Sequence, residues 1–380
     1  MNTLAEEFPL DDDLIYLNHA AVGVWPRRTR DAVRAFADEN MYRGAAGYLE
    51  WLKTEAELRR RLQWLLGADS VDDIALSKNT SEALSLIAYG LEWQAGDSVV
   101  TSNQEFPSNR IVWESLSNKG VELRQADVSM DDPEAAMMAL CDERTRLLSI
   151  SSVQFATGLC MDLNRLGRFC HDNGILFCVD AIQSLGALNF DVEACQADFV
   201  VADAHKWMLG PEGIAVFYSR AEARDQLKLQ QYGWHMIERL GDFDAMDWTP
   251  ASSARRFEPG SPNMLGICAL NASLSLFEGV GMEQVEAAVL ARSKQLMAWV
   301  QSESQLELIT SDHPGRFAGI VSFRHKGLDH LGHTALYHKL MGAGLVCANR
   351  AGGIRFAPHF YSDMDGIVQC WGEVLATFDE

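Results

Sequence analysis

The first two-thirds of the chain alternates between short apolar runs and longer segments with apolar residues at helical spacing. The apolar runs are rich in β-branched residues and predict strands at 74–77, 98–101, 147–153, 175–179, 199–201 and 213–219. The periodic segments predict helices at 27–43, at 55–66 and directly after Thr80. Strands that alternate with helices indicate a mostly parallel sheet covered by helices. We therefore expect one doubly wound α/β domain in this part of the chain.

The pattern changes after residue 230. From 230 to 262 the residues are polar and aromatic without periodicity, and a connection of this length is usually functional. A helical pattern at 282–301 leads to a smaller α+β unit, with strands predicted at 306–309, 320–324 and 345–348 and helices at 333–341 and 364–378. The predicted organisation is an N-terminal arm (1–17), a large domain (18–262) and a small C-terminal domain (263–380).

Composition places the chain among globular proteins and limits its partners. Of its 380 residues, 48% are hydrophobic and 22% are charged. The formal net charge of -21 argues against nucleic acid or an anionic membrane, because either partner needs a clustered basic surface. No apolar run reaches the roughly 20 residues of a membrane span, and the acidic N-terminus is unlike a signal peptide. We expect a cytoplasmic protein with a small substrate and no membrane partner.

The eight cysteines give no sign of a metal site or a disulfide framework. None forms a Cys-x-x-Cys pair or a Cys/His cluster with ligand spacing. Cys178 lies inside an apolar run and is most simply a small core residue. No metal is therefore predicted.

Two of the predicted strands lead to residues of opposite charge. The runs 175–179 and 199–201 are followed by Asp180 and Lys206, about two dozen residues apart, enough for a strand, a crossover helix and a parallel strand. Both side chains would then emerge at the carboxyl edge of the sheet, where open α/β sheets bind ligands. A buried Asp–Lys ion pair is the competing interpretation, because ion-pair networks also place such residues at strand ends.

Two further features lie beside predicted elements. Thr80 or Ser81 is suited to cap the helix that follows, with Glu82 in its first turn. The same helix end presents free N–H groups to an anion such as phosphate, and both roles can hold together. Phe106 follows the strand at 98–101 and either packs in the core or covers a flat ring.

These residue types match what pyridoxal 5′-phosphate (PLP) requires of a protein. The cofactor needs a lysine for a Schiff base, an acid that keeps the pyridine nitrogen protonated, a phosphate site and a group over the ring. One each is supplied by Lys206, by Asp180, by Thr80 with Ser81, and by Phe106.

The motifs around these residues resemble the class V aminotransferase family, which includes cysteine desulfurases, kynureninase and isopenicillin-N epimerase-like enzymes. The resemblance covers nearly the whole chain. Its stretches are 16–21, 79–83, 105–109, 180–183 with 204–207 and 210–213, 256–261, and 355 with 359–361. It implies the PLP-dependent transferase fold of aspartate aminotransferase-like proteins (fold type I), with a mostly parallel sheet in the large domain and a smaller α+β domain.

The resemblance also implies a role for each matching residue. Lys206 forms the Schiff base and moves the α-proton, while Asp180 pairs with the pyridine nitrogen. The other cofactor contacts are Gln183 at the phenolic oxygen, Phe106 over the ring, Thr80, Ser81 and His205 at the phosphate, and Ser261 from the partner subunit of a homodimer. The substrate contacts are Arg355, whose planar guanidinium suits an α-carboxylate, and Asn18, His19 and Trp234 in the pocket.

Several positions depart from the family pattern. Desulfurases place a nucleophilic cysteine on a mobile loop shortly before the carboxylate-binding arginine. Here the stretch 350–353 is short and Cys347 ends an apolar run, so a persulfide on that loop is not expected. Asp203 stands where the family often has a small hydroxyl residue near the phosphate, which a bare carboxylate would repel. Phe155 stands where desulfurases carry an asparagine that contacts the cofactor, and Gln154 is a candidate to replace it.

The expected function is that of a PLP-dependent enzyme that removes the Cα proton of a small amino acid. Transamination is the first choice. A C–S or C–Se β-lyase without a loop cysteine, or an amino-acid epimerase, is the alternative, because each begins with the same deprotonation. A non-catalytic binding protein of this fold is disfavoured, since it has no need of Lys206, Asp180 and Arg355 together.

Overall fold

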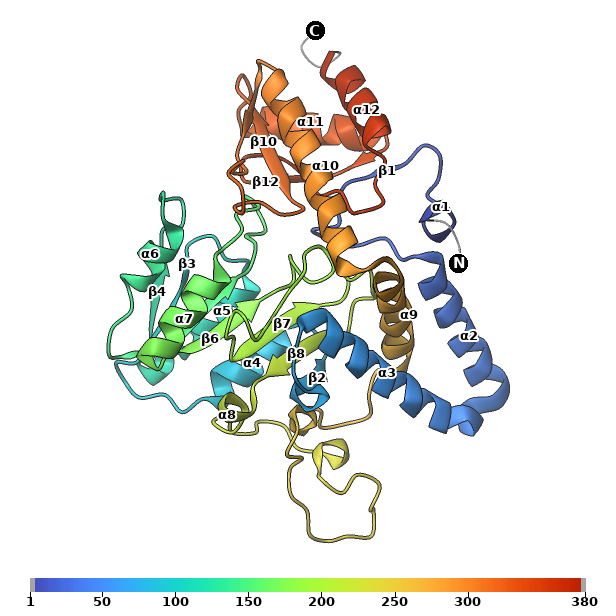
Figure 1. Ribbon diagram of the computed structural model, residues 1–380, viewed down its shortest axis with the longest axis vertical. Helices are drawn as coiled ribbons and strands as arrows, with labels where there is room; N and C mark the ends of the chain where they lie inside the picture. Colours follow the sequence, from blue (N-terminus) through green and yellow to red (C-terminus); the bar gives the residue numbers. More distant parts are fainter. Residues whose placement is uncertain (1–3, 377–380) are drawn as a thin grey trace.

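The computed structural model describes residues 4–376, and its centre is a seven-stranded sheet of order β2-β8-β7-β6-β5-β3-β4 (Figure 1). The strands are β2 (Ile74–Ser77), β3 (Ser98–Ser102), β4 (Glu122–Ala126), β5 (Thr145–Ser151), β6 (Leu176–Asp180), β7 (Phe199–Asp203) and β8 (Ala215–Ser219). Strands β4, β3, β5, β6 and β7 run parallel, while β8 is antiparallel to both β7 and β2. This confirms the predicted mostly parallel sheet. The edge strand β4 has a largely polar sequence, so the apolar pattern does not predict it.

The connection between β6 and β7 differs from the prediction. The spacing predicts a crossover helix, but residues 181–198 form successive turns without a helix. Gly186 lies in this connection with φ +93, and a Cβ there would lie 2.3 Å from the Trp207 carbonyl oxygen. Because a left-handed backbone and this close approach both interrupt a helix, the connection stays irregular. The two strands are still parallel neighbours, so both end at the same edge of the sheet.

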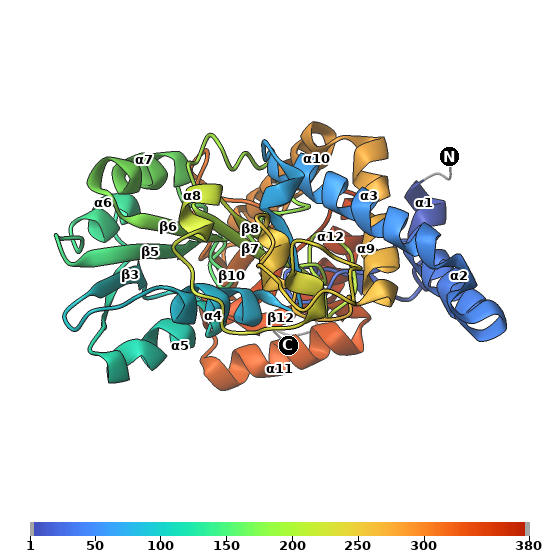
Figure 2. The ribbon, with the colours of Figure 1, turned by 90° about the horizontal axis from the view of Figure 1, so that it is seen from below.

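Helices cover both faces of this sheet (Figure 2). On one face lie α4 (Thr80–Gly90) and α5 (Ser108–Glu114), and on the other α6 (Pro133–Met138) and α7 (Leu163–Asn173). The helices predicted at 27–43 and 55–66 are α2 (Arg27–Arg43) and α3 (Tyr48–Leu66), the second beginning earlier than predicted. Two short helices, α1 (Leu4–Glu7) and α8 (Ala221–Arg224), complete this part.

A buried helix, α9 (Met264–Val280), packs against α2 and α3 and does not follow from the sequence pattern. Its residues are apolar or small on nearly every side, as in helices buried all round, so it shows no amphipathic stripe. It is followed, after a bend of 86°, by α10 (Met282–Ser302). No single helix of the described chain is long and apolar enough to cross a membrane, although this bent pair together meets those criteria.

The C-terminal part is a smaller α+β unit around a four-stranded sheet of order β12-β13-β10-β9. Its elements are β9 (Leu306–Leu308), β10 (Val321–His325), α11 (His330–Gly342), β11 (Leu345–Val346), β12 (Ala348–Arg350), β13 (Gly353–Phe356) and α12 (Met364–Ala376). The run predicted at 345–348 is thus two strands, and β11 pairs with β1 (Ile15–Tyr16) of the N-terminal arm. The last two residues of the helix predicted at 364–378 lie outside the described chain.

The long helix α10 connects the two hydrophobic cores. Its first half contributes Val285 and Val289 to the core of the large sheet. Its second half contributes Leu296 and Val300 to the core of the smaller unit, where Trp371 packs edge-on against neighbouring rings. The second core therefore begins inside α10, and the domain boundary at 262–263 stays a prediction.

The connection at 230–262 is irregular, as predicted, and a buried arginine fastens its end. Its only regular turns in the described chain are η4 (Trp234–Met236) and η5 (Ala254–Phe257). Arg59 of α3 donates to Glu258 at 2.8 and 2.7 Å and to Glu55 at 2.6 Å. Glu258 also accepts the Leu76 N–H of β2 at 2.9 Å. Both acids lie close to His235 in a geometry that could hold a metal ion, but both are already ion-paired with the Arg59 guanidinium.

Removing this guanidinium is expected to destabilise the fold strongly. Arg59→Met leaves two buried carboxylates without their cation, which lowers the free energy of unfolding by about 3–5 kcal/mol. Equilibrium urea unfolding measures this loss. In the control Arg110→Met, an exposed pair with Glu114 is removed, and the loss should not exceed about 1 kcal/mol. Equal losses in the two variants would contradict the structural role of the buried pair.

Candidate active site

Seven of the predicted site residues line one cavity of about 230 Å³ at the carboxyl ends of β6 and β7. They are Thr80, Phe106, Asp180, Gln183, His205, Lys206 and Arg355. Most come from the edge of the large sheet, whereas Arg355 comes from β13 of the smaller unit. The cavity therefore lies where the two units meet.

Asp180 and Lys206 face this cavity, and no ion pair joins them in the described chain. Asp180 is the last residue of β6, and its Oδ1 accepts the Ile182 N–H at 3.0 Å. Burial raises the pKa of Asp180 well above its usual range and lowers the pKa of Lys206 below its usual range. A lysine whose pKa is lowered in this way is more readily available as a nucleophile near neutral pH. The geometry favours a ligand site over the competing ion pair.

Backbone from the N-terminal loop closes on the same residues. Gly23 packs so tightly that a Cβ there would lie 2.2 Å from the Lys206 carbonyl oxygen, so only glycine fits. Gln183 donates to the Ala20 carbonyl at 3.1 Å and accepts from the Trp207 indole at 2.8 Å. These bonds fix the orientation of the Gln183 amide in the cavity wall.

The amino end of α4 opens into the cavity at Thr80. The residue that caps this helix is Asn79, whose Oδ1 accepts a backbone N–H of the first turn at 2.9 Å, so the prediction of Thr80 or Ser81 as cap is wrong. Asn79 has the extended backbone that an N-cap requires. Thr80 Oγ1 is left to accept the Asp203 N–H at 3.1 Å. Ser81 does not line the cavity, because its hydroxyl donates to Ser108 at 2.9 Å.

Phe106 faces the cavity rather than the core, and 42% of it is exposed. Its ring centroid lies 5.5 Å from Lys206 Nζ and 5.2 Å from the ring of Phe155, which meets it edge to face. Gln154 does not line the cavity. It is buried, and its Nε2 donates to Glu105 at 2.9 Å while its Oε1 has no partner in the described chain, so its replacement of a cofactor-contacting asparagine stays a prediction.

Arg355 presents a buried guanidinium to the cavity. Its Nη1 donates to the Phe155 carbonyl at 2.6 Å and its Nη2 to Asn18 Oδ1 at 3.3 Å, while its buried Nε has no partner in the described chain. Burial, and then repulsion from Arg350, lowers the pKa of Arg355 to about 10. An arginine held in this way lacks a carboxylate partner and is suited to bind one.

Arg355→Lys is expected to weaken substrate binding more than turnover. The lysine keeps the charge but loses the bidentate geometry, which should raise KM by about 10- to 100-fold, the equivalent of one charged hydrogen bond. Steady-state kinetics with the best amino-acid substrate measures KM and kcat separately. An unchanged KM would show that Arg355 does not bind the carboxylate.

The lining residues absent from the predicted set include two with polar side chains, Ser108 and Arg350. Ser108 belongs to the stretch 105–109 that carries Phe106, and its position at the start of α5 could have indicated it. Arg350 ends β12 in the tight turn before Arg355, and a second cation beside a carboxylate site is a signal available in the sequence.

Several predicted residues lie outside this cavity in the single chain. They are Asn18, His19, Ser81, Trp234 and Ser261. His19 is buried between the Ala357 carbonyl at 2.8 Å and the Tyr361 hydroxyl at 2.7 Å, and burial lowers its pKa to about 4. Trp234 and Ser261 line two other hollows, because the 230–262 connection extends away from the sheet (Figure 1). A role for Ser261 in a partner's site stays a prediction.

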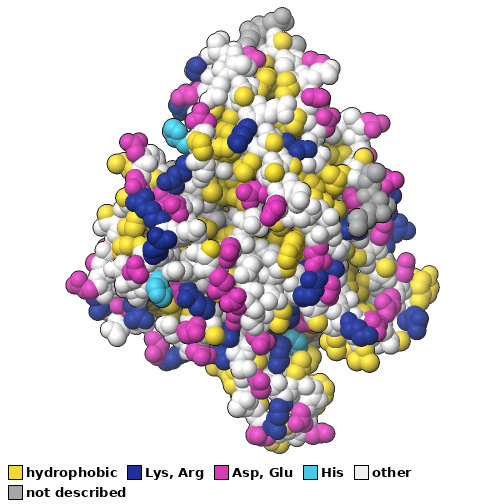
Figure 3. All heavy atoms as spheres, viewed as in Figure 1, with side chains coloured by type: hydrophobic (Ala, Val, Ile, Leu, Met, Phe, Trp, Pro, Cys, Tyr) yellow, Lys and Arg dark blue, Asp and Glu magenta, His cyan; other side chains and the backbone are white. Residues whose placement is uncertain are grey.

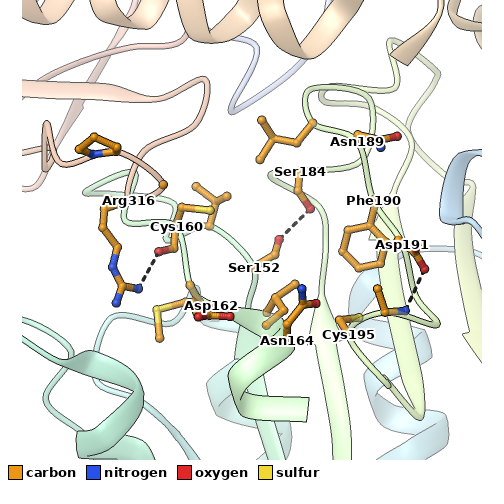
Figure 4. A pocket seen from close by; sticks show the side chains of 17 residues that line it. Ser152, Cys160, Asp162, Asn164, Ser184, Asn189, Phe190, Asp191, Cys195 and Arg316 are labelled. Carbon is orange, nitrogen blue, oxygen red and sulfur yellow. Dashed lines mark hydrogen bonds between the residues drawn. The ribbon is translucent and has the colours of Figure 1, made fainter. Parts of the chain in front are cut away.

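A larger hollow of about 560 Å³ contains none of the predicted residues (Figure 4). The hydroxyls of Ser152 and Ser184 face one another there at 2.8 Å. Arg316 on its rim is already paired with the buried Glu134 at 2.6 and 2.8 Å. The groups able to carry chemistry thus gather in the smaller cavity.

Comparisons with known proteins agree with this geometry. A family described as aminotransferase class-V matches residues 15–367. A probable cysteine desulfurase of Methanothermobacter thermautotrophicus is 31% identical, over 97% of this chain and 96% of its own length. The apo structure of a cysteine desulfurase from Thermococcus onnurineus NA1 has a TM-score of 0.85 at 24% identity, covering 99% of this chain and 97% of that one. The cystine C–S lyase C-DES, in complex with its product cysteine persulfide, has a TM-score of 0.86 at 23% identity, covering 94% and 96%.

Proposed function

The chain belongs to the class V aminotransferase family, and we propose that it is a lyase that breaks the C–S bond of a cysteine-type amino acid by β-elimination. It is a PLP-dependent enzyme of fold type I. The sequence motifs place transamination first and a C–S lyase second. The relative named a probable cysteine desulfurase, matched over nearly the whole chain, supports the second choice.

The cavity fits PLP on features of this chain alone. Asp180 is a buried acid with no ion-pair partner in the described residues, and Lys206 is a buried amine beside it. The open end of α4 at Thr80 suits a phosphate, and Arg355 has a buried N–H without a partner. When bound, PLP supplies a conjugated ring that withdraws electrons from the substrate Cα.

We assign each residue a task in the reaction. Arg355 binds the α-carboxylate and so fixes which bond at Cα faces the ring. Lys206 Nζ takes the Cα proton, and Asp180 keeps the ring nitrogen protonated. The electron pair left at Cα forms a Cα–Cβ double bond while the Cβ–S bond breaks, and sulfur leaves with its electrons as a thiolate. Water then converts the three-carbon enamine to pyruvate and ammonia.

The observation that carries this proposal is that no cysteine of the described chain lines the cavity. Cys347, the cysteine nearest in sequence to Arg355, is buried in the core of the smaller unit. Burial raises the pKa of its thiol to about 12, so the nucleophilic thiolate is scarce. Sulfur therefore leaves as the thiolate released from Cβ, without transfer to the protein.

Replacing Cys347 is expected to leave sulfur release nearly unchanged. Cys347→Ala removes a buried thiol from the core, and kcat/KM should stay within about twofold because that thiol touches no reacting group. Sulfide or thiol release is measured beside PLP occupancy. Loss of sulfur release with retained cofactor would assign persulfide chemistry to this cysteine and overturn the proposal.

A panel of amino acids separates the candidate reactions. The holoenzyme is mixed with cysteine, cystine, selenocysteine and alanine, and pyruvate, free thiol and the cofactor spectrum are followed. We expect pyruvate with sulfide from cysteine, pyruvate with cysteine persulfide from cystine, and little conversion of the cofactor to its amine form. Conversion of the cofactor without release of sulfur would instead support transamination.

We also propose a homodimer. Met41, Tyr42 and Leu49, at the α2–α3 turn, are 65%, 77% and 74% exposed. Figure 3 shows apolar side chains gathered over this projecting end of the molecule. Exposed apolar patches commonly mark interfaces, and light scattering after size-exclusion chromatography tests the expected mass of two chains.

A further inference from the structure

Asp203 lies at the end of the cavity where α4 begins. It is the last residue of β7 and lines the cavity, and only 12% of its side chain is exposed. Its Oδ1 is fully buried and has no hydrogen-bond partner in the described chain. Burying a carboxylate oxygen without a hydrogen-bond partner costs free energy. We therefore expect a ligand bound here to supply the missing hydrogen bond.

The groups that face this carboxylate come from four elements. The backbone N–H and hydroxyl of Thr80, at the start of α4, favour its charged form. His205 Nδ1 lies 4.0 Å from Oδ2, and Lys206 adds a positive charge. Asp180 at the end of β6 and Glu212 before β8 add negative charge. At this end of the cavity the amino terminus of α4 is therefore suited to seat an anion, and a carboxylate already faces it.

A phosphate bound at this terminus meets an acid at short range in a buried setting. His205 is neutral near pH 7 in the protein without ligand, because burial and then the neighbouring Lys206 lower its pKa to about 4. Burial raises the pKa of Asp203 to about 6, and a phosphate monoester has its second pKa at about 6. Two acids of matched strength can hold one proton between them, which removes the repulsion and supplies the missing hydrogen bond.

We propose that Asp203 shares one proton with the phosphate of the bound cofactor, so that cofactor binding takes up a proton from solvent. The direction of the pH dependence follows from the uptake of this proton on binding. Above the pH at which both free groups have lost their protons, affinity falls as pH rises. The inference rests on the PLP site and is independent of which substrate the enzyme uses.

Phosphorus NMR of the holoenzyme tests the shared proton directly. In the wild-type protein the ³¹P resonance of the cofactor should lie away from the dianion position and should move as pH is raised. In Asp203→Ser and Asp203→Asn it should lie at the dianion position at pH 7 and above, since neither side chain holds a proton to share and the second pKa of a phosphate monoester is about 6. A wild-type resonance fixed at the dianion position would overturn the proposal.

The proton uptake is measured with pyridoxine 5′-phosphate, which lacks the aldehyde and so does not react with Lys206. Binding to cofactor-free full-length protein is titrated at several pH values above pH 7. For each unit that the pH rises, the affinity of the wild-type protein should fall by close to tenfold more than the affinity of Asp203→Asn. This difference corresponds to one proton taken up on binding. Glu212→Gln, which removes a nearby acid outside the cavity, should keep the wild-type slope. Equal slopes in the wild type and Asp203→Asn would mean that Asp203 only faces α4 and shares no proton.

Discussion

Lys206→Ala is expected to reduce kcat/KM for sulfur release by at least about 10⁴-fold, because one amine serves both as the covalent attachment point and as the base at Cα. No other lysine in the described chain lines the cavity, so no side chain there can take over. Purified wild-type protein treated with borohydride should carry the cofactor on Lys206 when its peptides are sequenced by mass spectrometry.

Lys53→Ala is the matched control for this variant. Lys53 is an exposed lysine of α3 that pairs with Glu50 and does not line the cavity, so its loss should change neither the labelling nor the rate. Borohydride label on a lysine other than Lys206, or full activity in Lys206→Ala, would contradict the assignment of Lys206 as the attachment point and the base.

Asp180→Asn is expected to lower kcat by about 10²- to 10³-fold, the typical effect of removing one preorganised electrostatic group. The amide keeps the shape of the side chain but has no charge with which to hold the ring nitrogen protonated. Attachment of the cofactor to Lys206 should survive, because it needs only the amine. Stopped-flow measurement of the step that follows substrate binding, with the borohydride label in parallel, separates the two effects.

Asp198→Asn provides the control, because Asp198 is a largely buried acid at the opposite end of the same pair of strands, directly before β7, where it also pairs with Arg220. Asp198 accepts the Phe177 N–H at 2.7 Å and lies outside the cavity, so this variant can lose stability without losing the chemical step. An equal fall of kcat in both variants would show that Asp180 acts through the fold and not on the cofactor.

The sheet is predictable because its strands are buried on both faces and therefore read as apolar runs. This holds for β6 and β7, whose ends place Asp180 and Lys206 at one edge. The connection between them is not predictable, since its irregular path depends on the close approach of Gly186 to the backbone of Trp207. Similarly, α9 has no polar face because α2 and α3 cover it. This packing belongs to the tertiary structure and leaves no periodic pattern in the sequence.

The site residues also divide into those that regular elements make predictable and those that they do not. Residues at the ends of strands or the start of a helix, such as Lys206, Asp180 and Thr80, reach the cavity because regular elements aim them there. Trp234 and Ser261 lie on the long irregular connection, whose path no periodicity specifies. Gln154 does not line the cavity, because its Nε2 donates to Glu105 in the core. The spacing of residues along the chain does not reveal this buried hydrogen bond.

The most direct test of the proposed reaction is to follow cysteine labelled with ¹³C at Cα and Cβ by NMR during turnover by the holoenzyme. Elimination predicts labelled pyruvate and free sulfide in equal amounts, at a rate unaffected by Cys347→Ala. Labelled alanine with sulfur left on the protein would contradict the proposal in favour of desulfuration through an enzyme cysteine, and a labelled keto acid that retains its sulfur would contradict it in favour of transamination.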